Sequence, residues 1–176
     1  MLYPENHAAA ISAKKYAETI INISESKGYD VDLCAYSRVN LGYMELLKEE
    51  AIAGVTPEAL ANCPAPRMPL PDLVITCNNI CNTLLKWYEN LAKELDIPCI
   101  IIDVPYNHTM PVSQHAKEYI VDQFKYCIKQ LEDVCGKPFD YDKFVKVQEQ
   151  TQRSVAAWDR AMGMCAHTPS PMNGFD

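Results

Sequence analysis

The sequence predicts an α/β fold in which an open parallel sheet, of Rossmann or flavodoxin-like type, is flanked by helices. Two short apolar runs rich in β-branched residues, 72–77 and 97–104, have the character of buried strands. The residues between them follow a helical period, which is typical of a strand–helix–strand unit. Two more amphipathic segments, 118–135 and 142–162, predict a helical segment at the C-terminal end.

The first part of the chain predicts helices separated by one short extended stretch. Small and apolar residues recur at helical spacing from Ala8 to Lys27, and Gly28 then provides a C-terminal stop. Residues 29–33 form a candidate strand, and residues 34–50 run into a second helix. Prolines crowd residues 53–71, so we expect a loop there with one short helical turn.

The helix of the central unit has clear signals at its start and along one face. Asn78 and Asn79 follow the first strand and are favourable residues at a helix start. Its length suits a crossover between parallel strands. Five apolar residues share one face: Ile80, Leu84, Trp87, Leu91 and Leu95.

The composition excludes several classes of protein. The chain has 176 residues, a net charge of −7 and 48% hydrophobic residues, which suits one folded domain or part of a larger one. The acidic balance argues against nucleic acid or an anionic membrane as a partner, because both select a basic surface. No apolar run reaches the ~18 residues of a membrane span, and no secretory signal is evident, so we expect a cytoplasmic location. The 8 cysteines are therefore expected to be reduced thiols or metal ligands.

Two cysteines stand where open α/β sheets usually bind ligands. Cys34 and Cys77 each follow a short apolar run and precede a polar, helix-starting segment, and ligands bind outside the carboxyl ends of such strands. Thiolates at helix N-termini are good ligands for soft metals and iron–sulfur clusters. The alternative is that each is a small packing residue, as most free cysteines are. Cys81 forms a C-x3-C pair with Cys77, a spacing that local metal motifs use less often than C-x2-C.

Other chemical signals in the sequence are weak. It contains neither a glycine-rich nucleotide fingerprint nor the motifs of zinc proteases and serine hydrolases. Cys99, Cys127 and Cys135 lie in apolar patterns that predict packing. The carboxylate of Glu5, just before the first helix, would either stabilise the positive end of the helix dipole or act as a general acid or base if that end faces the cysteines.

An ordered series of segments resembles one family. The segments are Leu-Tyr-Pro-Glu-Asn-His at 2–7, Asp-Leu-Cys-Ala-Tyr-Ser-Arg-Val-Asn-Leu-Gly at 32–42, Pro-Asp-Leu-Val-Ile-Thr-Cys-Asn at 71–78 and Ile-Pro-Cys-Ile-Ile-Ile-Asp-Val-Pro-Tyr at 97–106, and the likeness continues to Gly174. Together they resemble the 2-hydroxyacyl-CoA dehydratase and benzoyl-CoA reductase family over essentially the whole chain.

The resemblance implies a longer subunit with an iron–sulfur centre. Family subunits hold a [4Fe–4S] cluster between α/β domains, so we expect an α/β domain with the cluster cysteines over 1–113. Residues 114–176 would then form a helical segment that leads to a second α/β domain outside this chain. By resemblance Cys34 and Cys77 are cluster ligands, a third ligand lies outside the chain, and Glu5 matches the family's upstream glutamate.

The resemblance also implies an activity. An ATP-hydrolysing iron–sulfur activator would pass one electron to the cluster and on to a 2-hydroxyacyl-CoA thioester, whose ketyl radical loses the hydroxyl group and yields an enoyl-CoA without net reduction. Glu5 would transfer protons, and Ser37, three residues from Cys34, would supply a hydroxyl at the site.

The implied partners are a homologous second subunit, the activator and the CoA thioester. A flavin is compatible with the family but is not indicated by the sequence.

Two alternative functions stay open. The chain would otherwise belong to an ATP-dependent aromatic acyl-CoA reductase of the benzoyl-CoA type, or to a non-catalytic partner subunit without a cluster. Iron content and product analysis distinguish them.

Overall fold

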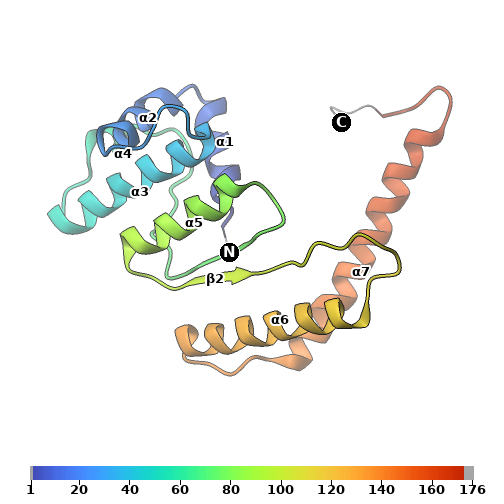
Figure 1. Cartoon of the computed structure of the whole chain (residues 1–176). Helices are drawn as coiled ribbons and strands as arrows, with labels where there is room; N and C mark the ends of the chain where they lie inside the picture. The colour runs from blue at the N-terminus through green and yellow to red at the C-terminus, as the bar shows by residue number, and fades with distance from the viewer. Residues whose placement is uncertain (1, 173–176) are drawn as a thin grey trace. The chain divides into compact units, whose positions relative to one another are not determined.

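The computed structural model describes residues 2–172, and the chain divides into two units, Met1–Val134 and Cys135–Asp176. The first unit opens with α1 (Pro4–Ala13), α2 (Ala17–Ser26) and α3 (Ala35–Ala53) (Figure 1). The predicted domain boundary between residues 113 and 114 stays a prediction. The end of the quoted family likeness, at residues 173 and 174, lies outside the described residues.

The single helix predicted from Ala8 to Lys27 is wrong, because the helix is interrupted between α1 and α2. Lys15 adopts a positive φ of 59°, which no helix interior accommodates. The apolar period continues from one helix to the next because each buries one face. Ile11 of α1 and Ile20 of α2 are both fully buried. Gly28, with a φ of 96°, lies just beyond α2 and confirms the predicted stop.

The candidate strand at residues 29–33 is also wrong, because this stretch is a turn. The carboxylate of Asp30 accepts a hydrogen bond from the backbone N–H of Asp32 at 2.9 Å. The carbonyl of Asp30 accepts another from the N–H of Leu33 at 3.1 Å. These bonds curl the backbone, and Val31 is exposed, so the stretch lacks the burial of a central strand.

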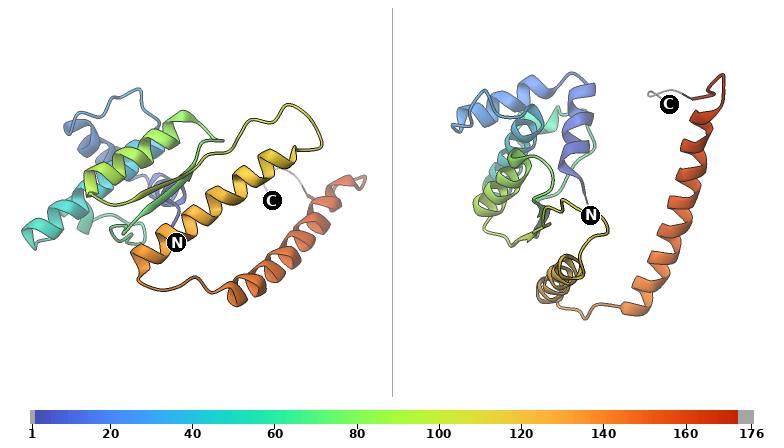
Figure 2. Two further views of the ribbon diagram at one scale, coloured as in Figure 1. Left: turned by 60° about the horizontal axis from the view of Figure 1, so that its bottom comes forward. Right: turned by 45° about the vertical axis from the view of Figure 1, so that its right-hand side comes forward.

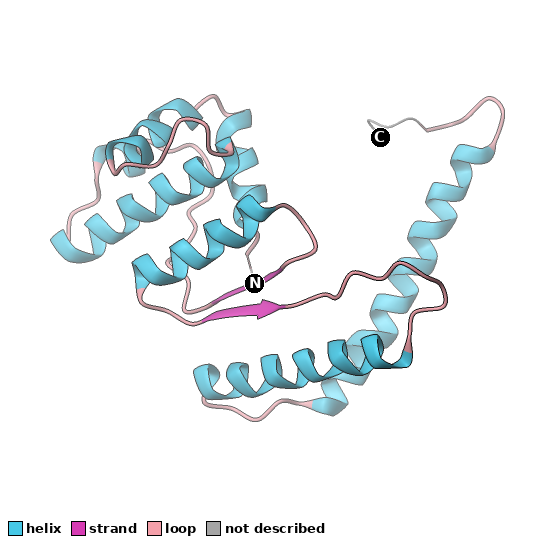
Figure 3. Cartoon of the chain, in the orientation of Figure 1, coloured by secondary structure: helices cyan, strands magenta, loops and turns pink. Residues whose placement is uncertain are grey.

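The predicted strand–helix–strand unit is confirmed. The loop before it contains one short helix, α4 (Glu58–Ala61), as expected. Strands β1 (Val74–Cys77) and β2 (Cys99–Ile102) pair in parallel with Cys77 opposite Ile102, and α5 (Asn82–Leu95) connects them (Figure 3). The helix begins after Cys81 and not at the two asparagines.

The fold is broadly α/β but predominantly helical. Within residues 2–172 the sheet consists of β1 and β2 alone. A Rossmann or flavodoxin-like open sheet is therefore not confirmed. The segments predicted as further α/β structure, before residue 72, are helices and turns.

The core of the first unit lies between α1, α2, α3 and α5. Helices α3 and α5 lie side by side and run in the same direction, as both further views agree (Figure 2). Helix α2 approaches α3 so closely at Gly42 that a Cβ atom there would lie 3.2 Å from the carbonyl carbon of Ile20. The largest fully buried apolar side chains are Tyr43, Ile11, Ile20 and Val39.

The predicted C-terminal helical segment is confirmed. Helix α6 (Gln114–Cys135) begins earlier than expected, and α7 (Tyr141–Gly163) follows with the short 3-10 helix η1 (Met164–Ala166). Asp140 caps α7 by accepting a hydrogen bond from the N–H of Lys143 at 2.8 Å. None of the helices among the described residues combines the length and apolar character that a membrane crossing requires.

Candidate functional site

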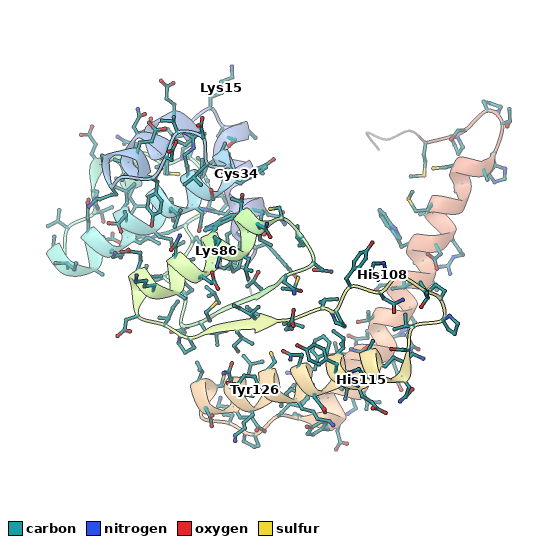
Figure 4. All side chains as sticks on the ribbon, viewed as in Figure 1. Lys15, Cys34, Lys86, His108, His115 and Tyr126 are labelled. Carbon is teal, nitrogen blue, oxygen red and sulfur yellow. The ribbon has the colours of Figure 1, made fainter. Side chains whose placement is uncertain are left out.

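Cys34 occupies the N-terminal end of α3 (Figure 4). Its side chain is exposed, forms no disulfide and makes no capping hydrogen bond to the helix. The unpaired N–H groups and the dipole of the following helix favour an anionic ligand at this end. The prediction that Cys34 stands at a helix start is therefore confirmed, although a turn and not a strand precedes it.

Ser37 fastens the first turn of α3 to the residue that carries the thiol. Its hydroxyl donates a hydrogen bond to the carbonyl of Cys34 at 2.7 Å. Ser37 itself is only 1% exposed. This contact fixes the backbone of Cys34, while the catalytic role expected for the hydroxyl stays a prediction.

Cys77 is the last residue of β1 and is partly exposed. Its thiol donates to the side-chain oxygen of Asn79 at 2.7 Å. The predicted position of Cys77 at a strand end is confirmed. The residue thus stands at the edge where the two parallel strands end, the usual place for ligands in α/β folds.

A polar network that sequence reasoning missed fixes the loop behind Cys77. The side-chain oxygen of Asn78 accepts from the backbone N–H of Val104 at 2.7 Å, and its amide nitrogen donates to Asp103. The hydroxyl of Tyr119 donates to the other oxygen of Asp103 at 2.5 Å. The signal in the sequence was Asn78, a polar side chain directly after a buried strand.

Helix α5 connects the two cysteine-bearing elements. The indole N–H of Trp87 donates to the side-chain oxygen of Asn40 at 2.9 Å, which joins α5 to α3. Because the two helices run in the same direction, their N-terminal ends lie at the same end of the pair (Figure 1). Cys34 directly precedes α3, and Cys77 ends the strand before α5. Cys81 is the N-cap of α5, and its sulfur accepts from the N–H of Leu84 at 3.4 Å.

Glu5 lies in the first turn of α1 and contacts α5. The buried phenol of Tyr88 donates to both carboxylate oxygens of Glu5, at 3.2 and 3.4 Å. Burial, followed by the negative charge of Glu5, raises the pKa of Tyr88 well above its ordinary value of 10.0. Tyr88 therefore stays a proton donor throughout the physiological pH range.

The remaining cysteines differ in burial. Cys127 is buried and Cys99 is partly buried, and burial raises the pKa of both thiols, as expected for packing residues. Cys135, predicted to pack, is exposed. Cys63 is partly exposed and Cys165 is exposed. Among residues 2–172 no group of three His, Cys, Asp or Glu side chains is arranged to hold a metal ion.

An apolar pocket of about 420 Å³ lies beyond the carboxyl end of β2. Lys117 supplies the one charged side chain among the residues that line it. Such a pocket suits an apolar ligand group next to a negative one. The lining residues are Val104, Pro105, Asn107, Val112, Ala116, Lys117 and Ile120.

Known proteins resemble this chain along its length. The family profile described as "2-hydroxyglutaryl-CoA dehydratase, D-component" matches residues 3–176. Lactoyl-CoA dehydratase subunit alpha of Anaerotignum propionicum is 64% identical over 176 residues, which cover 100% of this chain and 42% of that protein. The (R)-2-hydroxyisocaproyl-CoA dehydratase alpha subunit of Clostridioides difficile is 45% identical over 100% of this chain and 40% of its own length.

A more distant relative carries a different activity in its name. A benzoyl-CoA reductase subunit of Thauera aromatica is 25% identical over 98% of this chain and 37% of its own length. The chain thus spans about two fifths of the length of the curated relatives it matches. Since the family profile matches nearly every residue, the chain belongs to the 2-hydroxyglutaryl-CoA dehydratase D-component family.

Proposed function

We propose that this chain is part of an alpha-type subunit of a 2-hydroxyacyl-CoA dehydratase, a lyase that removes water from a 2-hydroxyacyl-CoA and gives an enoyl-CoA. The observation that carries the proposal is the 64% identity, over the whole chain, to a protein named as a lactoyl-CoA dehydratase subunit. Lactoyl-CoA is therefore the first substrate to test. The 25% identity to a benzoyl-CoA reductase subunit gives less support to a reductase.

The same proposal includes a [4Fe–4S] cluster with Cys34 and Cys77 as ligands. Both are free thiols with access to solvent, and they precede neighbouring helices that run in the same direction. These features suit soft-metal ligation, and the remaining ligands would come from outside the described residues. When bound, the cluster would supply one-electron transfer and an iron that binds the substrate oxygen.

The chain's own residues would hold the cluster ligands and move a proton. The Ser37 hydroxyl holds the backbone of Cys34, and the Asn78 side chain holds the loop after Cys77. The carboxylate of Glu5 would transfer a proton to or from the bound thioester. The apolar pocket beyond β2 offers space for the acyl group.

The proposed partners follow from the family. They are a homologous second subunit, an ATP-hydrolysing iron–sulfur activator and the CoA thioester. Relatives named as alpha subunits support the second subunit. The net charge of −7 gives no support to a nucleic acid as partner.

The decisive experiment measures iron and acid-labile sulfide in the full-length protein, prepared without oxygen together with its partner subunit. We expect Cys34→Ala and Cys77→Ala each to lose most of the iron. Cys81→Ala is the matched control, because Cys81 is also exposed and lies four residues from Cys77, yet caps α5. Iron that survives both substitutions would contradict the assigned ligands.

Product analysis tests the reaction itself. With the activator, ATP and a reductant, we expect lactoyl-CoA to yield the corresponding enoyl-CoA. Glu5→Gln should keep its iron and turn over about 100-fold more slowly, within the range of general acid–base catalysis. Reduction of an aromatic acyl-CoA with no dehydration would favour the reductase. A wild-type protein without iron would favour a non-catalytic subunit.

A further inference from the structure

We propose that Tyr88 is a positioning residue that holds the Glu5 carboxylate in the orientation needed for proton transfer. The inference rests on the proposed function, in which Glu5 exchanges a proton with the thioester. Its own basis is a hydrogen bond between residues 83 positions apart in the sequence.

The geometry of the contact restricts the carboxylate. The hydroxyl of Tyr88 lies 3.2 Å from one oxygen of Glu5 and 3.4 Å from the other. One proton shared between both oxygens resists rotation of the carboxylate about its terminal bond. Glu5 is only partly buried, so part of its side chain is accessible to a ligand.

The donor is itself held in place. Tyr88 is 8% exposed, and its ring packs edge-on against Trp87 with the ring centres 5.4 Å apart. Trp87 is bonded in turn to the fully buried Asn40 of α3. Since Trp87 joins this turn of α5 to α3, the position of the phenol does not depend on its bond to the carboxylate alone.

A helix-dipole role for Glu5 does not account for this contact. An acidic residue in the first turn of α1 is stabilised by the local N–H groups alone, without a partner from another helix. Instead, the structure connects Glu5 to the helix that follows Cys77. The orientation of the carboxylate therefore depends on α5, the helix that follows the proposed cluster ligand Cys77.

The bond also restricts the carboxylate, which makes the inference testable by chemical modification. The hydroxyl of Tyr88 lies against both oxygens of Glu5. Removing the hydroxyl should therefore leave the carboxylate free to rotate and faster to react with a carboxyl-modifying reagent.

The experiment uses the complete enzyme with its partner and compares wild type, Tyr88→Phe, Glu5→Gln and the double variant. We expect Tyr88→Phe to retain iron and to lower kcat roughly 10-fold with KM almost unchanged. In the Glu5→Gln background the same substitution should have no further effect. Tyr16→Phe is the control, because the Tyr16 hydroxyl donates to the Ala59 carbonyl at 3.0 Å and not to a carboxylate.

A second measurement separates this inference from the proposed function. A water-soluble carbodiimide modifies carboxyl groups, and peptide mass spectrometry reports the rate of Glu5 modification at one fixed pH without any turnover. A faster rate in Tyr88→Phe, absent from Tyr16→Phe, supports the contact even if lactoyl-CoA is not a substrate. An unchanged rate, or independent effects in the double variant, would overturn the inference.

Discussion

Replacing Gly42 by alanine should force α2 and α3 apart. A Cβ atom at this position would lie 3.2 Å from both the carbonyl carbon and the Cγ2 of Ile20, and closer still to the carbonyl oxygen. Two of these three atoms belong to the backbone of α2, so no change of rotamer relieves the overlap. The helices must separate, and the buried contacts between them must loosen.

The expected cost combines two opposing effects. Overpacking of a core costs typically 1–3 kcal/mol, and we take about 3 kcal/mol because a helix backbone has to move. Alanine is intrinsically better than glycine in a helix by about 1 kcal/mol, which offsets part of that cost. The net loss is about 2 kcal/mol in the free energy of unfolding, or a fall in Tm of about 4–8 °C.

Thermal and urea unfolding of the chain would measure this loss. Gly163→Ala provides the control, because Gly163 is also helical, at the end of α7, and has no atom within 4 Å of its added Cβ position. We expect that variant to equal or slightly exceed the wild type in stability. If Gly42→Ala were as stable as Gly163→Ala, the close approach of α2 and α3 would be refuted.

Two further predictions concern buried and charged contacts of α3. Trp87→Phe removes the donor to the fully buried Asn40 and should cost about 2 kcal/mol in urea unfolding, while Trp158→Phe, at a position 65% exposed, should cost almost nothing. Equal stability of these two variants would contradict the role of the buried bond. Burial of Glu45 opposes ionisation, but ion pairing with Lys48 outweighs it and lowers the pKa of Glu45 below its ordinary 4.5, so Glu45→Gln should cost about 0.5–1 kcal/mol at neutral pH. That contribution is present above the ordinary value and is lost as the pH falls below it, so a gap between variant and wild type that persists at about pH 3 would contradict the assignment.

The predictable parts of the fold are those in which the local sequence pattern fits only one type of secondary structure. The run 72–77, the helical stripe after it and the run 97–104 differ in period and are bounded by polar residues or proline, so the strand–helix–strand unit followed. The break at Lys15 was not predictable, because the apolar period continues from α1 into α2. At 29–33 nearby apolar residues suggested a strand. The backbone instead forms a turn, because the Asp30 carboxylate accepts a hydrogen bond from the N–H of Asp32.

The same distinction applies to the candidate site. The positions of Cys77 at a strand end and of Cys34 at a helix start were predictable, because each depends on neighbouring residues. The bond between Glu5 and Tyr88 was not predictable. It joins α1 to α5, and the residues around each partner give no indication of the other. Contacts of this kind depend on how helices pack, which periodicity alone does not determine.

The polar anchors of α5 explain why the core contains Asn40 and a tyrosine bonded to a carboxylate. A purely apolar interface would tolerate a small rotation or slide of α5, since hydrophobic contacts are not directional. The consecutive residues Trp87 and Tyr88 instead make hydrogen bonds to two different helices, α3 and α1. A rotated α5 would leave buried polar atoms unpaired, and that penalty selects one arrangement even where the net gain in stability is small. Because Cys77 ends the strand that leads into α5 and Cys34 begins the helix packed beside it, the same two bonds also restrict where the two thiols lie.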